Sequence, residues 1–397
     1  MSKITENEVV EVFSLAFGGK SVARRESGKV CFLQGVLPSE KVRIAVIGEK
    51  KNFSTGKVLE ILEKSPARIN EYCSLSCPGC PYRMMEYSLE LQWKEKQLLS
   101  FLARLKKMKL KNILPAVGAE ERLAWRSKIS LHLVNGELCY TGWDNLTPVP
   151  VKECPLADKR INEFLAAGKW RDKVEPGAER VTFRCTEKDG VTFHTDKSRD
   201  KVILTEELGI YGTFLVEQRS FFQINHAMAQ KLISSYLATV EKLAPQNILE
   251  LYCGCGVFSL LAAKLCHIPC RGIELDASSI HLAKENAANR GVENLCKFYA
   301  GDAGKVMKSL YGGRKVSPGT LLIVDPPRTG LAPNAAEMLL AAESDWILYI
   351  SCGPDTLMRD LEILAQKYSA EEIQLFDLFP STAHFETLVL LKKNSFS

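Results

Sequence analysis

Asn247-Ile-Leu-Glu-Leu-Tyr-Cys-Gly-Cys-Gly256 is the stretch of this chain that decides its fold. It begins as a short apolar run typical of a strand, passes two glycines, and continues at Val257 into a helical pattern. Glycines at such a strand–helix turn let a ligand approach the backbone closely. The stretch therefore predicts the first strand, the ligand-binding turn and the first helix of an α/β sheet.

The same strand-then-helix pattern repeats through residues 216–397. A second strand is expected to end at Glu274, and two more strand-like runs lead to Asp302 and Asp325. Strands that alternate with helices indicate a parallel sheet with helices on both faces. We therefore expect a Rossmann-like α/β domain over residues 216–397, with acids at successive strand ends.

These acids and the turn glycines narrow the choice of cofactor. Glu274 stands at the end of the second strand, where a carboxylate can hold two ribose hydroxyls, so NAD and S-adenosylmethionine both fit. Ser259 occupies the place of the third glycine in the dinucleotide fingerprint. Asp302 and Asp325 also suit an adenine edge and a cationic sulfonium better than a diphosphate. We predict S-adenosylmethionine, with a dinucleotide as the alternative.

A lone cysteine ends another strand-like run, Asp345-Trp-Ile-Leu-Tyr-Ile-Ser-Cys-Gly-Pro354. In an open α/β sheet, ligands bind beyond this end of the strands. Cys352 is therefore a candidate nucleophile, because a thiolate is highly nucleophilic and neighbouring groups can lower the thiol pKa. Taken by itself, the residue is read more readily as a small buried hydrophobe.

Composition indicates a globular protein with more than one domain. The 397 residues are enough for two or three domains, and 46% of them are hydrophobic. No apolar run approaches the roughly 20 residues of a membrane helix, and the polar start at Met1 is unlike a signal sequence. Thirteen cysteines in such a chain are expected to be reduced, metal-bound or catalytic. We expect a cytoplasmic protein with no membrane or obligate protein partner.

Residues 1–66 are predicted to form a small all-β domain. Turn signals separate short runs rich in β-branched residues: Val9–Phe13, Val30–Leu33, Val42–Ile47 and Lys57–Leu62. Strands of this size suit an OB-like barrel, which commonly binds oligonucleotides. The basic loop from Ala16 to Arg25 fits that role, and a generic β-barrel with solvated lysines fits the same pattern.

Three cysteines stand close together in Cys73-Ser-Leu-Ser-Cys-Pro-Gly-Cys80. Their sulfurs can converge on one centre, and Cys154 is the best candidate for a fourth ligand. Zinc sites usually contain two symmetric cysteine pairs, so a triplet plus one distant cysteine favours an iron–sulfur cluster over zinc. We expect residues 67–215 to form a central α+β domain that holds this cluster.

In this order, the motifs resemble those of the iron–sulfur RNA (uracil-C5)-methyltransferases, the bacterial group that makes 5-methyluridine in 23S rRNA. The resemblance covers nearly the whole chain. The strings Gly18–Arg24 and Phe32–Pro38 are similar to parts of the family's RNA-binding TRAM domain. Ser351-Cys352 with Thr356-Leu-Met-Arg-Asp360 resembles the nucleophile motif, and Phe376–Glu386 resembles the segment that carries the general base.

The resemblance implies roles for particular residues. It implies a [4Fe–4S] cluster bound by Cys73, Cys77, Cys80 and Cys154. It implies S-adenosylmethionine contacts at Gln223, Tyr252, Glu274, Asp302 and Asp325. Cys352 would be the nucleophile and Glu386 the general base. The sequence departs from the family pattern in two places: three rather than the commoner five residues separate the first two cysteines, and Gly353 stands where Asn usually follows the nucleophile.

These roles imply a covalent mechanism, because uracil C5 is too weak a nucleophile to attack a methyl sulfonium unaided. Addition of the Cys352 thiolate to C6 would activate C5, and Glu386 would remove the C5 proton after methyl transfer. The uridine would be flipped out of a folded RNA, with 23S rRNA favoured and the T-loop of tRNA as the alternative.

Other classes fit the motifs less well. A cytosine-C5 methyltransferase has a second cysteine after the proline that follows Asp325, and this chain has none there. An amino-group methyltransferase expects an aromatic residue in place of Arg328. An iron–sulfur RNA-binding module without catalysis is disfavoured, because the nucleophile, the base and the cofactor acids are all present.

Overall fold

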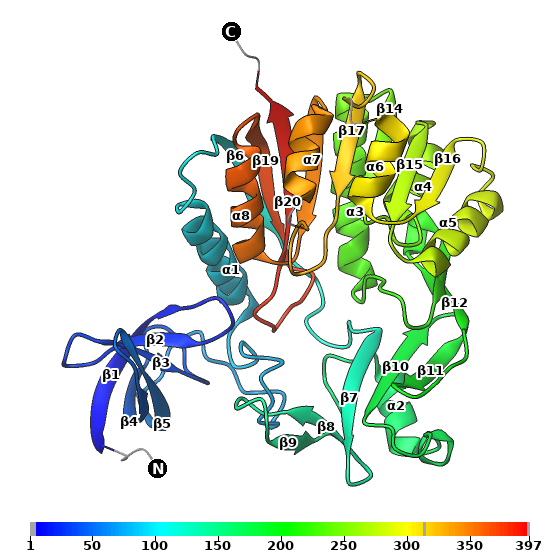
Figure 1. Cartoon of the computed structure of the whole chain (residues 1–397). Coiled ribbons are helices and arrows are strands. Elements are labelled where there is room, and N and C mark those ends of the chain that lie inside the picture. Colours follow the sequence, from blue (N-terminus) through cyan, green and yellow to red (C-terminus); the bar gives the residue numbers. More distant parts are fainter. Residues whose placement is uncertain (1–4, 313–314, 333, 395–397) are drawn as a thin grey trace. The chain divides into compact units, whose positions relative to one another are not determined.

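The computed structural model describes residues 5–312, 315–332 and 334–394 and separates the chain into two compact units. The first unit comprises Met1–Ser100, Cys139–Val151 and Phe379–His384, and the second comprises Phe101–Leu138, Lys152–Leu378 and Phe385–Ser397. Figure 1 labels most of the helices and strands of both units. The division into domains at residues 1–66, 67–215 and 216–397 stays a prediction from the sequence.

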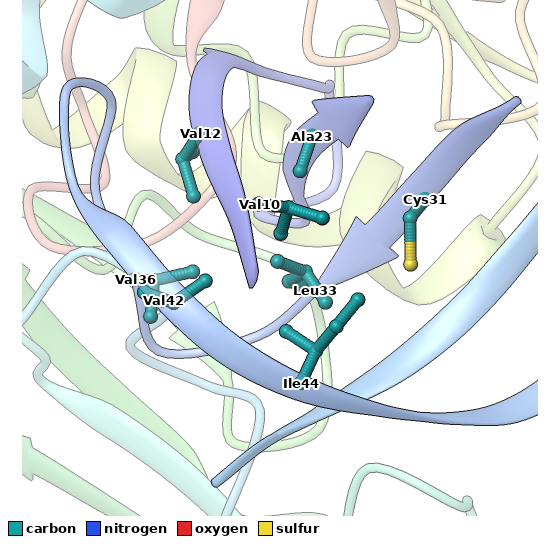
Figure 2. Packing of buried hydrophobic residues seen from close by; sticks show 8 residues of the cluster. All are labelled: Val10, Val12, Ala23, Cys31, Leu33, Val36, Val42 and Ile44. Carbon is teal, nitrogen blue, oxygen red and sulfur yellow. The ribbon is translucent and has the colours of Figure 1, made fainter. Parts of the chain in front are cut away.

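The first unit contains a closed five-stranded barrel with the strand order β1-β2-β3-β5-β4. Its strands are β1 (Thr5–Leu15), β2 (Ser21–Arg24), β3 (Val30–Leu33), β4 (Lys41–Glu49) and β5 (Phe53–Glu63). Side chains alternate between the two faces of a strand, so Val10 and Val12 of β1 are buried while Glu11 is exposed. Figure 2 shows the interior that results, built from Val10, Val12, Ala23, Cys31, Leu33, Val36, Val42 and Ile44. The predicted small barrel is present.

The rest of the first unit is organised around helix α1 (Tyr87–Leu102). A buried ion pair joins Lys94 to Glu90 at 2.8 Å. Lys94 Nζ also donates to the Phe379 carbonyl (3.2 Å), and the Ser381 amide donates to the Glu90 carboxylate (2.6 Å). A short antiparallel pair, β8 (Glu137–Thr141) and β9 (Pro148–Pro150), completes the ordered elements that reach into this unit.

An eight-stranded sheet with the order β16-β15-β14-β17-β18-β20-β19-β6 dominates the second unit (Figure 1). Its strands are β6 (Leu110–Val117), β14 (Asn247–Leu251), β15 (Cys270–Glu274), β16 (Cys296–Ala300), β17 (Thr320–Val324), β18 (Trp346–Ser351), β19 (Tyr368–Phe376) and β20 (Glu386–Lys393). Strands β14 to β18 are parallel, and β20 runs antiparallel between β18 and β19. All residues of β17, and all but the first residue of β14 and of β18, are buried, as expected for the central strands of a parallel sheet covered on both faces.

The helices of this sheet form two groups in contact, α3–α4–α5 and α6–α7–α8. They are α3 (His226–Leu243), α4 (Val257–Cys266), α5 (Ala277–Asn289), α6 (Ala303–Tyr311), α7 (Ala335–Ala342) and α8 (Pro354–Leu364). The strand order reverses between β14 and β17, so right-handed crossovers place helices on both faces of the sheet. This reversal marks the edge where doubly wound sheets bind ligands. The predicted Rossmann-like α/β fold is confirmed.

A smaller α+β part of the second unit precedes this sheet. Strand β10 (Arg180–Thr186) pairs antiparallel with β7 (Lys128–Val134) and with β11 (Gly190–Thr195), and β12 (Ile203–Glu207) pairs with β13 (Thr213–Glu217). Helix α2 (Lys159–Ala167) contacts β10 and β11. The Asn286 side chain on α5 exchanges two hydrogen bonds with the backbone of Leu215, which fixes β13 against α5.

Within the described ranges, every helix is too short or too polar to span a bilayer.

Candidate active site

The turn after β14 has the backbone conformation of a ligand-binding loop. Tyr252 has a φ of +65°, a value that costs energy for a non-glycine residue and is common at functional sites. Gly254 (φ +52°) would present an added Cβ to open space, with no atom within 4 Å. Its amide donates to the Glu274 carboxylate at 3.2 Å, which places the predicted ribose-binding acid at this turn. The loop leaves room for a ligand beside bare backbone.

A pocket next to this turn brings together three of the predicted cofactor contacts. Gln223, Tyr252 and Asp325 line it, although they come from three segments widely separated in the sequence. Apolar side chains and the backbone of the turn supply most of the remaining wall: Leu208, Phe221, Phe222, Leu232, Ile233, Val257 and Phe258. An apolar pocket with a few convergent polar groups is typical of a small-molecule site.

The five predicted cofactor contacts do not all play the same structural role. Glu274 bonds the turn through Gly254 and also accepts from the Asp276 amide (3.0 Å). Asp302 is exposed and caps α6 by accepting from the Lys305 amide at 3.0 Å. It is absent from the lining found for the pocket in the described part of the chain. The predicted contact of Asp302 with the cofactor therefore depends only on the position of this residue after the end of β16.

The pocket also contains an acid that the sequence reading missed. Glu250 lies on β14 and is 1% exposed, and one of its carboxylate oxygens accepts from the amide (2.9 Å) and the hydroxyl of Ser259. Burial raises its pKa to about 8. The signal was present in the sequence, because an acid in the middle of the apolar run Ile248–Leu251 must either be paired or serve a function.

Cys352 and Glu386 are brought together by strand pairing. Cys352 directly follows β18 and Glu386 begins β20, and these two strands are antiparallel with Ser351 opposite Thr387. The thiol and the carboxyl therefore belong to facing positions on neighbouring strands. Asp325 directly follows β17, which pairs with β18 on its other side. The predicted nucleophile and base thus lie at the same sheet edge as the pocket.

The charged groups at this edge affect one another's pKa values. Burial, followed by the charges of Glu386 and Asp325, raises the pKa of Cys352 to about 11, whereas Arg328 acts in the opposite direction. Burial and the charge of Asp325 raise the pKa of Glu386 well above its usual value, and Arg328 again opposes the shift. Burial raises the pKa of Asp325 to about 7. The site favours uncharged acids at rest, and Arg328 favours both the thiolate and the carboxylate.

Gly353 has a steric explanation. A Cβ at this position would lie 2.8 Å from Thr356 Oγ1 and 3.0 Å from the Arg328 carbonyl oxygen. The Thr356 hydroxyl, in the first turn of α8, lies 3.0 Å from the Gly353 carbonyl and 3.2 Å from the Arg328 carbonyl and can donate to either. The missing side chain therefore allows the nucleophile segment to pack directly against the backbone of Arg328.

The same helix holds the loop that follows Arg328. The Asp360 carboxylate is buried and accepts from the Tyr349 hydroxyl (2.7 Å) and the Leu331 amide (2.9 Å). Arg359 donates to the carbonyls of Thr329 (3.2 Å) and Leu331 (3.0 Å). The sequence motif after Cys352 thus fixes the loop that carries Arg328.

The predicted cluster ligands do not form a metal site in the described residues. Cys73, Cys77 and Cys80 lie in the first unit, and Cys154 lies in the second. Across residues 5–312, 315–332 and 334–394, no three His, Cys, Asp or Glu side chains gather so that they could hold a metal ion. The Asn162 side chain exchanges two hydrogen bonds with the backbone of Cys154 (2.9 and 3.0 Å).

Comparisons with known proteins agree with this geometry. Residues 180–394 match the family model described as tRNA (Uracil-5-)-methyltransferase. An uncharacterized RNA methyltransferase from Gloeobacter violaceus is 27% identical over 97% of this chain and 96% of that protein. Another from Clostridium acetobutylicum is 26% identical over 98% of both chains.

A solved structure shows the same fold over nearly the whole chain. The Pyrococcus abyssi tRNA (uracil-54, C5)-methyltransferase, in complex with S-adenosyl-L-homocysteine, superimposes with a TM-score of 0.72. The match covers 96% of this chain and 100% of that chain at 21% identity. At this level of identity the likeness supports the fold.

Proposed function

Because this chain belongs to the tRNA (uracil-5-)-methyltransferase family, we propose that it methylates C5 of a uridine in RNA through a covalent adduct on Cys352. The family makes the chain an S-adenosylmethionine-dependent RNA methyltransferase. The observation that carries the covalent mechanism is the pairing of Cys352 with Glu386 at the sheet edge that also carries the cofactor pocket.

The pocket fits the proposed cofactor. The open space at Gly254 suits a ligand that approaches the backbone, and the Glu274 carboxylate at the same turn can accept from ribose hydroxyls. Gln223 and Tyr252 would contact the cofactor from the two sides of the pocket that they line. Bound S-adenosylmethionine supplies an electrophilic methyl group.

Residues of this chain would carry out the remaining chemical steps. The Cys352 sulfur forms a bond to C6 of the uracil, and the electron pair of the C5–C6 bond moves toward O4, which makes C5 nucleophilic. After C5 has gained the methyl group, the Glu386 carboxylate takes the C5 proton, and the C6–sulfur bond breaks to restore the ring and release the thiolate. Arg328 favours the two charged forms that these steps need, the thiolate and the carboxylate.

A mechanism-based trap tests this proposal. RNA containing 5-fluorouridine has no C5 proton to release, so the methylated adduct should persist as an S-adenosylmethionine-dependent band on a denaturing gel. Cys352→Ala should abolish the band. Cys266→Ala, at the partly exposed end of α4, should leave it intact. Methylation of uridine by the Cys352→Ala protein would overturn the covalent mechanism.

The RNA target is proposed as 23S rRNA, on the strength of the motif resemblance. tRNA is the second candidate, because the matched family model is described as a tRNA methyltransferase. Mapping 5-methyluridine in the rRNA and tRNA of a strain that lacks this protein decides between them. Loss of one rRNA site with intact tRNA supports the first target, and loss of a T-loop methyl group supports the second.

Two further parts of the proposal rest on the sequence. The five-stranded barrel is proposed to be a TRAM domain that binds RNA, because of the strings Gly18–Arg24 and Phe32–Pro38. The [4Fe–4S] cluster is supported by the cysteine motif alone. Protein purified without oxygen should be brown and contain iron and acid-labile sulfide; colourless protein or zinc alone would remove the cluster from the proposal.

A further inference from the structure

A buried cation lies behind the segment that presents Gln223. Arg184, on β10, is 1% exposed, and its Nε donates to the equally buried Glu206 carboxylate at 2.5 Å. The second oxygen of Glu206 lies 3.0 Å from Nε2 of His226, the first residue of α3. Burying a charge costs desolvation free energy. The groups that the remaining N–H donors of Arg184 bind therefore indicate the role of this side chain.

The remaining donors of Arg184 bind the backbone of residues 217–220. Arg184 Nη1 donates to the carbonyls of Glu217 (3.3 Å), Gln218 (3.1 Å) and Ser220 (3.0 Å). The Lys128 ammonium donates to the carbonyls of Arg219 and Ser220, each at 3.3 Å. Two cations thus hold the four consecutive carbonyls of residues 217–220, which lead directly into the cofactor segment.

The two cations face each other across the sheet. Arg184 and Lys128 are register partners in the antiparallel pair of β10 with β7. Like charges directly opposite each other destabilise a sheet. Burial, and then the charge of Arg184, lowers the pKa of Lys128 to about 8. Pairing of β7 with β10 does not require two cations opposite each other. Hydrogen bonding of both cations to the carbonyls of residues 217–220 does require it.

The segment is also fixed beyond Gln223. The Ser127 amide, next to Lys128, donates to the Ile224 carbonyl at 2.9 Å. Asn225 is buried, caps α3 by accepting from the Met228 amide (3.2 Å), and donates to the Leu378 carbonyl (2.9 Å). Phe221, Phe222 and Gln223 lie between these two anchors, and all three line the cofactor pocket.

We propose that Arg184 and Lys128 are positioning residues that set the cofactor-binding conformation of residues 217–225. They act on the cofactor through the backbone that carries Phe221 and Gln223. This inference rests on the proposed function in one respect, since it takes the pocket at Gln223 to be the S-adenosylmethionine site.

Lys128→Met and Arg184→Lys test the proposal. Lys128→Met keeps the aliphatic stem of the lysine and removes the donor. Arg184→Lys keeps a cation beside Glu206 but cannot place a second nitrogen, as Nη1 does, against the three carbonyls. The matched control is Lys188→Met, which removes an exposed lysine from the turn between β10 and β11. We measure S-adenosylmethionine affinity without RNA by equilibrium dialysis, KM and kcat for methylation, and amide hydrogen exchange over residues 217–225.

We expect both variants to weaken S-adenosylmethionine binding and raise its KM by about tenfold, the lower end of what loss of a supporting residue costs a site. The kcat at saturating cofactor should stay within about twofold of the parent value, because the reacting groups are untouched. Amides of residues 217–225 should exchange faster in the variants and at the parent rate in Lys188→Met.

A purely structural role gives a different pattern. Loss of folded protein lowers kcat in proportion and leaves the KM and the dissociation constant of the cofactor unchanged, and that result would overturn the proposal. Failure of the proposed function looks different again. A parent protein that binds S-adenosylmethionine but methylates no uridine would leave the affinity and exchange measurements, and hence this inference, standing.

Discussion

Cys352 and Glu386 face each other across the pairing of β18 with β20, one residue beyond the pair Ser351–Thr387. The negative charge of Glu386 contributes to raising the pKa of the Cys352 thiol to about 11. The Glu386 carboxylate therefore opposes ionisation of the Cys352 thiol.

This opposition predicts how Cys352 reacts with iodoacetamide. Only the thiolate reacts, so below a pKa of about 11 the alkylation rate should rise about tenfold for each pH unit. At a pH high enough to ionise Glu386, Glu386→Gln should speed the reaction, and Arg328→Met should slow it, because the two charges act in opposite directions. The rate is followed by mass spectrometry of the Cys352 peptide. A plateau already reached near pH 8 would contradict the prediction.

Replacement of the base should stop the reaction after methyl transfer. In Glu386→Gln the C5 proton is no longer removed, so ordinary uridine-containing RNA should accumulate as a covalent complex on a denaturing gel. Turnover should fall by on the order of 10²–10⁴, the range found for loss of a general base. The matched control is Glu371→Gln, which removes a carboxyl from a surface ion pair with Lys111. Normal turnover in Glu386→Gln would exclude this residue as the base.

Restoring the residue that commonly follows the nucleophile should harm this enzyme. In Gly353→Asn the new Cβ would press on Thr356 and on the Arg328 carbonyl, so we expect kcat/KM to fall by about 10–100-fold. Adding Thr356→Ala removes the nearer of the two contacts and should recover part of the loss. Gly136→Asn is the control for adding the side chain without crowding, because its Cβ position has no atom within 4 Å and Asn is among the side chains that best tolerate a positive φ such as the +81° found there. Unchanged activity in Gly353→Asn would show that this packing is dispensable.

The Asp360 carboxylate should contribute measurably to stability. Asp360→Ala leaves the buried Tyr349 hydroxyl and the Leu331 amide without their acceptor, so the free energy of unfolding should fall by about 1–3 kcal/mol. Tyr349→Phe removes one donor and should cost less. Denaturant unfolding of both single variants and the double variant gives the coupling between them. Fully additive losses would show that the two side chains do not act together.

The sequence predicted the parts of the site that strand ends and motifs define. Asp325 and Cys352 each stand at the end of an apolar run, and in a parallel sheet such ends meet at one edge, so their proximity followed from the pattern. Glu386 instead begins its strand, and the motif resemblance predicted its role. The small barrel was equally visible, because turn signals separate its strands. For such residues, the neighbouring sequence is enough to predict the structural role.

The remaining parts depend on partners far along the chain. Strand β6 extends the sheet beside β19, although Lys111 and its ion-pair partner Glu371 are 260 positions apart. In the sequence Arg184 and Lys128 look like ordinary polar strand residues, and only the return of residues 217–220 shows which carbonyls the two cations bind.

The bonds from α8 to the loop after Arg328 bear on when the site is assembled. Thr356, Arg359 and Asp360 bind the backbone of residues 328–331 before any RNA arrives. The conformational entropy of that loop is therefore lost during folding, and the encounter with a uridine does not have to supply it. Under the proposed mechanism, an incoming base would meet a thiol and an arginine whose separation the helix has already limited, so binding energy would remain available to extract the nucleotide from its stack.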